Sequence, residues 1–410
     1  MPFDENPAKN SIYKGAEHDW LCSFIKRNRS MKKIVIASDS FKGSLPSMEI
    51  AVQAERAIRE VYPACRIEKA GIADGGEGTV EALVSGMGGE FCTVRVNDPL
   101  MRPLDARYGI VDNGKTAVIE LSAAAGLPLL LPEERNPERT TTYGTGQMIA
   151  DALRHGCRKI LVGIGGSATN DGGMGLLTAL GYRFFDEAGN ILPGRGTSTG
   201  RVARIDGSAC MVALRDTEIQ VACDVNNPFF GERGAAQIFA PQKGADAAMV
   251  ERLDAGLARF AEAIRAYNGT DIGTLPGAGA AGGAGGGMYA LLGARLCPGI
   301  EMVLDALSFD RMLEGADLVI TGEGRLDRQT TMGKAPGGVL ARARKQNIPV
   351  VAIAGAVEAA DELLAQGFAA VFPIQAAPTS LPEAMETARA AENIRRTVKQ
   401  IVNLLKSFGQ

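Results

Sequence analysis

The sequence predicts an α/β fold: a doubly wound parallel-sheet domain of the Rossmann or flavodoxin type, with a second, mixed α/β domain inserted in it. Both ends of the chain alternate apolar runs typical of buried strands with segments of helical periodicity, which favours a parallel sheet. The middle of the chain contains an alternating pattern around a tight turn, which favours antiparallel strands. With 410 residues, the chain exceeds the length at which one core usually divides into two domains.

The amino-terminal part of the predicted parallel sheet begins at residues 32–38, a continuous apolar run with β-branched residues. A helix is predicted over 47–61, with Ser47 in the capping position. The strand predicted over 65–73 ends in a glycine-rich turn, and the next helix starts at Thr79. This β–α–β–α order predicts parallel strands.

The middle of the chain is predicted to form a mixed sheet. Residues 104–122 alternate in hydropathy around the turn 112–114, which reads Asp-Asn-Gly and is a signal for a two-stranded hairpin. The other predicted elements are a helix over 145–156, a strand over 159–165, a helix near 175–181, a strand over 218–225 and a helix over 246–266.

The parallel pattern returns in the last third of the chain. The glycine-rich stretch 276–287 is predicted to be a boundary loop, because glycine disfavours both helix and strand. After it come a helix over 288–296, strands over 316–324, 349–355 and 369–374, and helices over 335–346, 358–367 and 381–406.

The predicted domains combine both ends of the chain. Residues 31–75 and 285–410 are assigned to the doubly wound domain, and residues 76–284 to the inserted domain. Residues 1–30 contain a short apolar stretch followed by basic residues, with no small-residue cleavage site. We therefore interpret them as a loose extension rather than a secretory signal.

Composition and charge exclude several classes of function. The formal net charge is −3, so the chain lacks the basic character typical of proteins that bind nucleic acids or anionic membranes. No apolar run reaches the roughly 18 residues that a membrane span needs. The seven cysteines are widely spaced and form no CxxC pair, which indicates free thiols in a reducing, cytoplasmic compartment. We expect neither a nucleic-acid nor a membrane partner.

Two glycine motifs match nucleotide-binding patterns only formally. Residues 109–116 match the phosphate-loop pattern, but alternating residues on both sides favour a hairpin turn over a strand–loop–helix unit. Residues 163–168, with Asp186 about twenty residues further on, match part of the dinucleotide fingerprint. A hydroxyl-rich, acidic segment stands where that fingerprint needs a helix to begin, so an NAD-linked sugar-acid dehydrogenase is kept as an alternative.

Four segments combine glycine with charged residues directly after predicted strands. They are residues 39–44, 73–79, 165–173 and 321–334. In doubly wound sheets, ligands bind beyond the carboxyl ends of the strands. Glycines let backbone N–H groups reach phosphate oxygens, lysines add positive charge, and carboxylates hold Mg²⁺ together with substrate phosphates. The four segments favour phosphoryl transfer, although each one alone is also typical of a tight loop.

The small number of histidines limits the possible catalytic mechanisms. Outside residues 1–30 the chain has one histidine, His155, at the end of a predicted helix, where a positive side chain complements the helix dipole. Hydrolytic triads, HExxH zinc sites and Cys–His pairs therefore lack a component. The general base is left to a carboxylate.

Longer literal segments resemble one enzyme family. The runs SDSFKGSL, IADGGEGT, DPLMRP, TTYGTGQ, GIGGSATNDGG, ACDVNNPFFG, APQKGA, PGAGAAGG, VITGEGRLDRQT and AIAG occur in the order typical of bacterial glycerate kinases, over about residues 31–405. The resemblance implies ATP-dependent phosphorylation of D-glycerate to 2-phosphoglycerate with Mg²⁺, with 3-phosphoglycerate as the alternative product. It also implies two α/β domains, one inserted in the other, and leaves a homodimer open.

Three positions depart from the pattern that this resemblance implies. Ser38 stands where the family usually has proline, Met101 replaces a common glycine, and Gln147 replaces a common glutamate. None of these changes removes a charged residue from the four segments. Gln147 cannot supply an acid, so no such role is assigned to it.

The catalytic hypothesis assigns roles to three charged residues. Asp171 is predicted to be the general base for the glycerate hydroxyl, with capping of the following helix as the alternative role. Lys42 is predicted to offset the charge of the transferred phosphoryl group or of the substrate carboxylate, with an exposed surface lysine as the alternative. Asp74 is a further catalytic candidate, as a base or a metal ligand.

Other residues of the four segments are predicted to bind ligands. Glu323 and Asp327 are candidate Mg²⁺ ligands, with a surface ion-pair network as the alternative. The candidates for substrate or nucleotide binding are Asp39, Ser44, Gly75, Gly76, Glu77, Gly165, Gly166, Ser167, Thr169, Asn170, Gly172, Arg325 and Lys334. Asp224 and Lys243 are weaker candidates. A non-catalytic sensor, which would bind ATP without turnover, is a further alternative.

Overall fold

The computed structural model describes residues 31–330 and 333–407, and these residues form two compact units. The first unit holds the described residues up to Ala70, together with Asp310–Arg328 and the residues from Val339 onward. The second unit holds Gly71–Phe309 and Gln329–Gly338. The predicted amino-terminal extension, residues 1–30, lies outside the described residues.

The first unit is built on a parallel sheet with the strand order β13-β12-β11-β1-β2. Strand β1 pairs in parallel with β11, β11 with β12, and β12 with β13. Counted within this unit, the order is 2-1-3-4-5, as in flavodoxin-like sheets. The strands are β1 (Lys33–Ser38), β2 (Arg66–Gly71), β11 (Leu318–Leu326), β12 (Val350–Val357) and β13 (Ala370–Pro373).

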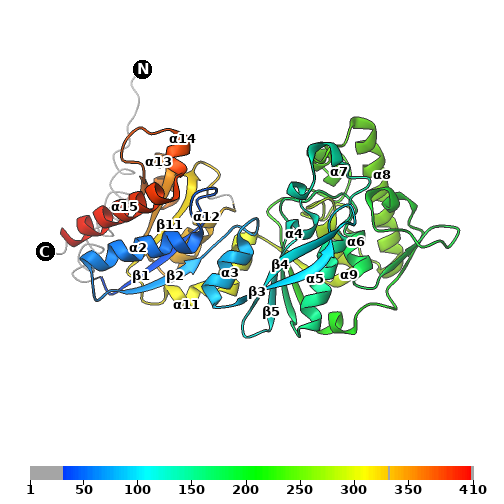
Figure 1. The fold of residues 1–410 in the computed structure, drawn as a ribbon, viewed down its shortest axis with the longest axis horizontal. Helices are drawn as coiled ribbons and strands as arrows, with labels where there is room; N and C mark the ends of the chain where they lie inside the picture. Colours follow the sequence, from blue (N-terminus) through cyan, green and yellow to red (C-terminus); the bar gives the residue numbers. More distant parts are fainter. Residues whose placement is uncertain (1–30, 331–332, 408–410) are drawn as a thin grey trace, which may run out of the picture. The chain divides into compact units, whose positions relative to one another are not determined.

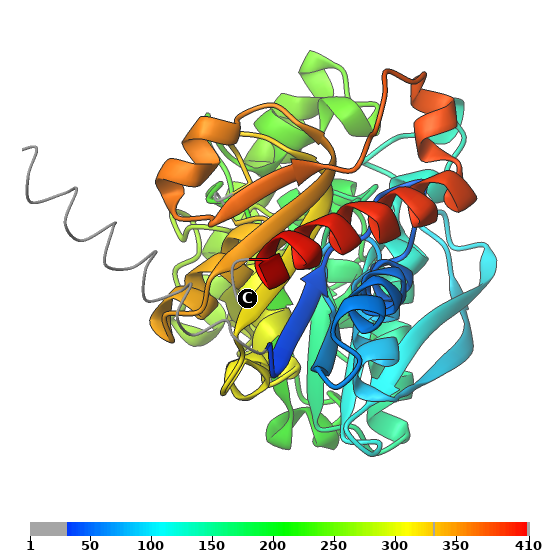
Figure 2. The ribbon, with the colours of Figure 1, turned by 90° about the vertical axis from the view of Figure 1, so that its left-hand side faces the viewer.

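Helices α2 (Ser47–Val61) and α15 (Thr387–Ser407) cover one face of this sheet, as Figure 2 shows with α2 in blue and α15 in red. Their apolar faces share one buried cluster with β1, β11 and β12, which explains why both helices have strongly amphipathic sequences. The other helices of this part of the chain are α11 (Phe309–Leu313), α12 (Ala335–Lys345), α13 (Ala360–Gln366) and α14 (Leu381–Met385), all of which Figure 1 labels.

The second unit is built on a mixed sheet with the strand order β10-β9-β6-β5-β4-β3. Strands β5, β6, β9 and β10 pair in parallel, whereas β3, β4 and β5 pair antiparallel. The strands are β3 (Glu90–Asn97), β4 (Pro103–Val111), β5 (Thr116–Glu120), β6 (Lys159–Gly163), β9 (Glu218–Ala222) and β10 (Arg295–Cys297). A separate two-stranded sheet pairs β7 (Arg183–Phe185) with β8 (Arg204–Asp206).

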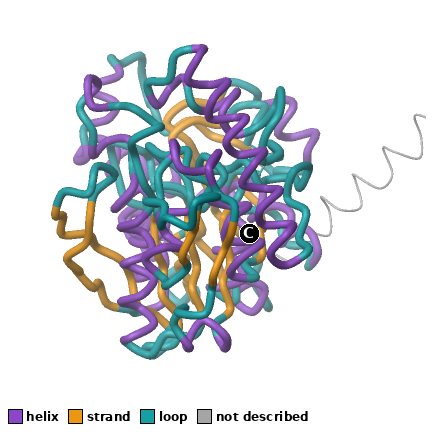
Figure 3. The backbone as a smooth tube through the Cα atoms, turned by 90° about the vertical axis from the view of Figure 1, so that its right-hand side faces the viewer, coloured by secondary structure: helices purple, strands orange, loops and turns teal. Residues whose placement is uncertain are grey.

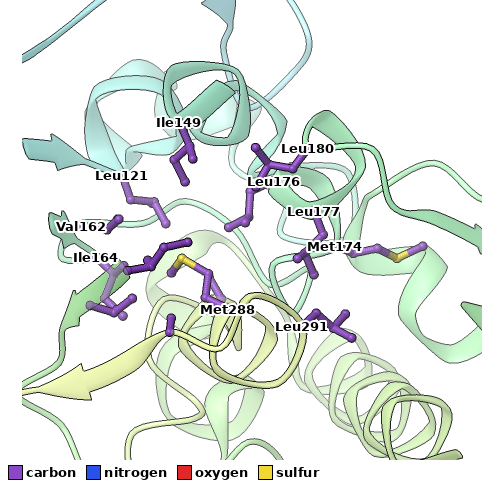
Figure 4. Close-up of a cluster of buried hydrophobic side chains, with 14 of the residues drawn as sticks. Leu121, Ile149, Val162, Ile164, Met174, Leu176, Leu177, Leu180, Met288 and Leu291 are labelled. Atoms are coloured by element: carbon purple, nitrogen blue, oxygen red, sulfur yellow. The ribbon is translucent and has the colours of Figure 1, made fainter. Parts of the chain in front are cut away.

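Helices surround this mixed sheet, as Figure 3 shows with helices in purple and strands in orange. They are α3 (Thr79–Met87), α4 (Ser122–Ala125), α5 (Tyr143–Arg154), α6 (Met174–Ala179), α7 (Ala235–Phe239), α8 (Ala247–Asn268), α9 (Ala284–Leu292) and α10 (Gly299–Ala306). Side chains from β6, α5, α6 and α9 meet in a continuous apolar core (Figure 4). This core holds the end of β6, from which the glycine-rich segment continues.

The α/β fold class with a doubly wound parallel sheet and a mixed sheet is confirmed. The predicted hairpin is also confirmed: β4 and β5 pair antiparallel, and Asp112 and Asn113 adopt φ of 54° and 52° between them. Both residue types tolerate this left-handed conformation well. The formal phosphate-loop match at 109–116 is therefore a hairpin turn.

Several predicted elements differ from the structure. The helix predicted over 381–406 is interrupted at Glu386, whose ψ of 123° is extended, and forms α14 and α15. The helix predicted over 288–296 begins earlier, at Ala284, and its last residues form strand β10 instead. Strand β3 was not predicted, because exposed and half-buried residues obscure its apolar pattern. In the described residues, no helix combines the length and apolar character needed to cross a membrane.

Candidate functional site

The turn over residues 74–78 packs directly against the carboxyl ends of β6 and β9. A Cβ atom on Gly163, the last residue of β6, would lie 2.5 Å from the Gly75 carbonyl oxygen. A Cβ atom on Gly75 would lie 2.6 Å from the Ala222 Cβ atom, at the end of β9. Both distances are far below van der Waals contact, so glycine is required at both positions.

The turn at Gly165 and Gly166 is open on one side. Both residues are exposed, and a Cβ atom on Gly165 would meet only the Gly76 Cα atom, at an ordinary 3.5 Å. Among the described residues, no acceptor receives the backbone N–H of Gly165 or Gly166. Free, neighbouring N–H groups in a turn with a left-handed glycine, here Gly166 at φ 71°, form a concave site for an anion.

One carboxylate, that of Asp74, lies on the turn that faces Gly165, and a second, that of Asp224, lies near Asp74. The Oδ1 atom of Asp74 accepts a hydrogen bond from the Gly76 N–H at 3.1 Å, and that of Asp224 accepts one from the Gly299 N–H at 2.9 Å. Burial against the surrounding chain raises the pKa of Asp224, and the charge of Asp74 raises it further. We refer to residues 74–77, residues 165–167 and Asp224 as the turn cluster.

The turn cluster contains a charge pattern that suits a divalent cation. Asp74 and Asp224 repel each other electrostatically, and a bound cation would relieve that repulsion. Among the described residues, no group of three or more His, Cys, Asp or Glu side chains is arranged to hold a metal ion. Mg²⁺ is commonly bound by one or two carboxylates, with waters and substrate phosphates completing its coordination, so the pair of carboxylates fits this ion.

Glu120, at the end of β5, is a residue that the sequence reasoning missed. Its Oε1 atom accepts a hydrogen bond from the Val80 N–H at 3.0 Å, so its carboxylate lies at the amino-terminus of α3. Burial raises the pKa of Glu120, the N–H groups at residues 78–80 oppose this, and the charge of Glu77 adds to the rise. The sequence signal was a carboxylate at the end of a buried strand, which needs a partner.

Asp171 lies inside the second unit rather than at its surface. Its side chain is fully buried, and its two oxygens accept hydrogen bonds from the N–H groups of Thr142, Gly173 and Gly175 and from the Thr142 hydroxyl, at 2.8–3.1 Å. Burial raises its pKa, and these four hydrogen bonds oppose the rise. Because Asp171 accepts the Gly175 N–H in the first turn of α6, which begins at Met174, this geometry supports the helix-capping alternative rather than the role of general base.

Lys243 is also buried, at the end of the short 3₁₀-helix Pro241–Lys243. Its Nζ donates to the Ser167 hydroxyl at 2.8 Å and to the Thr169 carbonyl at 2.6 Å. Burial lowers the pKa of Lys243 to about 7, and the charge of Asp171 opposes this shift. Lys243 therefore holds the glycine-rich segment in place from within the protein.

The remaining predicted residues of this segment are also internal. Thr169 and Asn170 are fully buried, and the Thr169 hydroxyl and both amide atoms of Asn170 have no partner among the described residues. A Cβ atom on Gly172 would lie 2.8 Å from the Phe260 ring. Of the predicted binding residues after β6, Gly165 and Gly166 are thus the exposed ones.

The first unit brings a different set of predicted residues together. The Asp39 N–H, after β1, donates to the Gly322 carbonyl on β11 at 2.8 Å, so the ends of these strands lie side by side. Asp39 and Glu323 are largely buried, whereas Lys42 is exposed. In flavodoxin-like sheets this edge, between the first and third strands, is the ligand-binding edge.

Ser44, Arg325, Asp327 and Lys334 are less concentrated. The Ser44 hydroxyl is buried without a described partner, and Asp327 is half-buried after β11. Arg325 forms an exposed ion pair with Glu358 at 2.5 Å, which matches the surface ion pair that was the alternative for this region. Lys334 belongs to the second unit, one residue after Gly333, where a Cβ atom would lie 3.9 Å from the Asp224 Oδ1 atom.

Two of the three positions that depart from the resembled family, Met101 and Gln147, have defined local geometry. Met101, in place of a common glycine, adopts a left-handed φ of 68°, which glycine accommodates more easily. The Gln147 side chain accepts a hydrogen bond from the Asn97 N–H at 2.8 Å and so fixes the end of β3.

The partial dinucleotide fingerprint at residues 163–168 lacks its structural context. Asp186, the acid of that fingerprint, forms an ion pair with Arg201, and the helix α6 begins only at Met174.

Comparisons with known proteins identify the relatives of this chain. A model of the glycerate kinase family matches residues 34–406. A glycerate kinase of Bacillus cereus is 45% identical over 375 residues, covering 91% of this chain and 98% of the relative. A glycerate 2-kinase of Escherichia coli is 44% identical over 372 residues, covering 89% and 98%. A crystal structure from Salmonella typhimurium LT2, assigned as glycerate kinase 2, superposes with a TM-score of 0.84 at 44% identity, covering 92% of this chain and 98% of its own.

Proposed function

The chain belongs to the glycerate kinase family, and on this premise we propose that it transfers a phosphoryl group from ATP to D-glycerate, giving 2-phosphoglycerate and ADP. The observation that carries this proposal is the open turn at Gly165 and Gly166, whose free N–H groups face the turn of Asp74, with Asp224 near Asp74. Phosphoryl transfer depends mainly on positioning and on neutralising charge, and this combination supplies both.

The N–H groups of Gly165 and Gly166 are proposed to bind phosphate oxygens of the nucleotide. Glycine at 165 lets an oxygen approach the backbone, because its nearest neighbour leaves that side open. Lys243 contributes by fixing Ser167 and Thr169, so the two N–H groups are held in place before the nucleotide binds.

Asp74 and Asp224 are proposed to hold Mg²⁺ with the nucleotide phosphates. When bound, Mg²⁺ supplies positive charge at the phosphate oxygens. Glu77 is exposed on the same turn as Asp74 and is the carboxylate that we propose as general base for the glycerate hydroxyl. In the first unit, Lys42 stays a predicted catalytic residue and Asp39 a predicted substrate or nucleotide contact. Glu323 and Asp327 stay predicted Mg²⁺ ligands.

The decisive experiment measures ADP release over a panel of three- to six-carbon sugar acids, with ³¹P NMR of the product. We expect turnover with D-glycerate and a phosphorus signal coupled to the proton on C2. A signal coupled to the C3 protons would replace 2-phosphoglycerate by 3-phosphoglycerate. ADP release with none of the acids, or NADH oxidation with hydroxypyruvate, would overturn the proposal.

Two broader expectations accompany this function. We propose a cytoplasmic location, because the six described cysteines are free thiols, as predicted. A homodimer stays a prediction, and sedimentation velocity tests it.

A further inference from the structure

A cavity of about 420 Å³ lies in the second unit, and none of its lining residues has a role assigned above. Its lining consists of Leu100, Glu133, Glu134, Arg135, Asn136, Arg139 and Arg195. Three of these seven residues are arginines, although the chain as a whole is slightly acidic. Two glutamates also line the cavity, Glu133 and Glu134, and Glu134 is paired with Arg102, so the lining holds one more arginine than glutamate.

The three arginines lack carboxylate partners within the described residues. Neither ion pairs nor side-chain hydrogen bonds join Arg135, Arg139 or Arg195 to any described group, and the buried Nε atom of Arg135 has no acceptor. Other arginines of the same unit are paired, as Arg102 is with Asp98 and Glu134. A buried donor without an acceptor is costly unless a ligand or water satisfies it.

The walls of the cavity are held rigidly by backbone packing. A Cβ atom on Gly244 would lie 2.3 Å from the Arg135 carbonyl oxygen, and one on Gly196 would lie 2.2 Å from the Pro137 carbonyl oxygen. The Thr197 N–H also donates to the Glu138 carbonyl at 3.0 Å. These contacts hold the segments that carry Arg135 and Arg195 in a fixed relation, which favours a preformed site.

The same segments connect the cavity to the glycine-rich segment. The Thr140 hydroxyl, one residue after Arg139, donates to the Ala168 carbonyl at 2.9 Å. Gly244, against Arg135, follows Lys243, whose Nζ contacts Ser167. Residues next in sequence to the cavity lining therefore hydrogen-bond to residues 167 and 168, which follow the open turn.

We propose that this cavity binds a small organic acid anion through its carboxylate or phosphate groups. Guanidinium groups present paired N–H donors that match the oxygens of both groups. The choice of ligand rests on the proposed function, because D-glycerate carries a carboxylate and its product carries a carboxylate and a phosphate. A cavity of this volume accommodates either one with water.

The test measures anion binding by isothermal titration calorimetry on the full chain, with D-glycerate, 2-phosphoglycerate and inorganic phosphate as separate probes. The variant is the double substitution Arg139→Gln/Arg195→Gln, which removes two charges at exposed positions and is expected to fold normally. The matched control is Arg215→Gln, an exposed arginine outside the cavity. A second variant, Arg135→Lys, keeps the charge and removes the paired donors.

We expect the double variant to raise Kd for at least one probe by tenfold or more, about the loss of 1.4 kcal/mol, and the control to leave it within about twofold. If the double variant binds D-glycerate more weakly and also has a higher KM for D-glycerate, the cavity is a substrate subsite. A loss for the phosphate probes alone identifies a separate anion site. Unchanged affinity in both cavity variants, or no binding of any probe to the wild-type chain at millimolar concentration, overturns the proposal.

Calorimetry needs no turnover, so it separates this proposal from the proposed kinase function. If ADP release fails while arginine-dependent binding persists, the kinase assignment fails and the anion site stands. If ADP release and D-glycerate KM are normal in the double variant and no probe loses affinity, the anion site fails and the kinase assignment stands.

Discussion

In the first unit, Lys42 in the turn after β1 lies at the surface, whereas in the second unit Lys243, which contacts the segment after β6, is buried. Both lysines belong to glycine-containing segments that look alike in sequence. The surface lysine is available to a ligand, and the buried one holds the protein's own backbone. Two other predicted site residues also differ in exposure: Arg325, in the first unit, forms an exposed ion pair, whereas Asp171, in the second unit, is fully buried.

The same contrast between buried and open positions applies to the glycines of the segment 163–175. At Gly163 the glycine makes room for another backbone segment, because a Cβ atom there would lie 2.5 Å from the Gly75 carbonyl oxygen, whereas at Gly165 it leaves an open surface. A glycine in such a segment therefore indicates that something approaches the backbone closely. The tertiary structure decides whether this is another segment of the protein or a ligand.

The largest expected effect concerns the open side of the turn cluster. Asp74→Asn removes one of the two carboxylates proposed to hold Mg²⁺ and should lower kcat by about a thousandfold, or about 4 kcal/mol. Steady-state ADP release at saturating Mg²⁺ measures it. Asp112→Asn, in the exposed β4–β5 turn, is the matched control and should retain full activity. Near-normal kcat in Asp74→Asn would remove Asp74 from the site.

Asp171→Asn tests the buried side of the comparison. The new amide group would face the N–H groups of Thr142, Gly173 and Gly175. It would also remove the negative charge near Lys243. Together these changes should destabilise the protein by about 3 kcal/mol. Urea unfolding followed by circular dichroism measures this loss, again against Asp112→Asn. A variant with wild-type stability and abolished turnover would instead restore Asp171 as the general base.

The buried Lys243 couples the stability of the protein to pH. The folded pKa of Lys243 is lowered from 10.5 to about 7, so between these values the unfolded chain binds a proton that the folded chain does not. This group therefore makes the folded state more stable as pH rises from 7 toward 10.5, by at most about 1.4 kcal/mol per pH unit. Lys243→Met should lose this gain when unfolding free energies at pH 7 and pH 9 are compared.

Lys42→Met is the control for that measurement. Because Lys42 is exposed, the variant should stay within about 0.5 kcal/mol of the wild type at both pH values. Equal pH dependence in the wild type and in Lys243→Met would show that Lys243 keeps its proton when folded.

A pair of glycine substitutions separates the two uses of glycine in one segment. In Gly165→Ala the methyl group would lie 3.5 Å from its nearest neighbour, so folding is preserved and the approach of phosphate is impeded. We expect KM for ATP to rise about tenfold with an unchanged melting temperature. Gly163→Ala should instead unfold at a lower temperature. Equal melting temperatures for the two variants would contradict the assignment.

The smallest effect is expected at the surface of the first unit. Arg325→Ala breaks an ion pair in which the two side chains are 62% and 52% exposed, and should change the unfolding free energy by less than about 0.5 kcal/mol. Denaturant titration at low and high salt measures it. A larger, salt-dependent loss would show that this pair is structural.

Much of the fold and part of the candidate site could be predicted from the sequence. Strand–helix alternation and the Asp-Asn-Gly turn were sufficient to predict the parallel sheet and the hairpin, because hydrophobic periodicity and turn chemistry are local properties. Strand β3 and the break at Glu386 were not visible, because their conformations depend on pairing and packing with distant residues.

The same division applies to the site. The sequence by itself determined which segments carry glycine and charge at the ends of strands, and so indicated Asp74, Gly165 and Asp171 together. Only the tertiary structure decided that Asp171 lies inside, on the N–H groups of three other residues, while Gly165 lies open. Burial is set by residues far away in the chain, such as Phe260 and Lys243, and a local pattern contains no information about them.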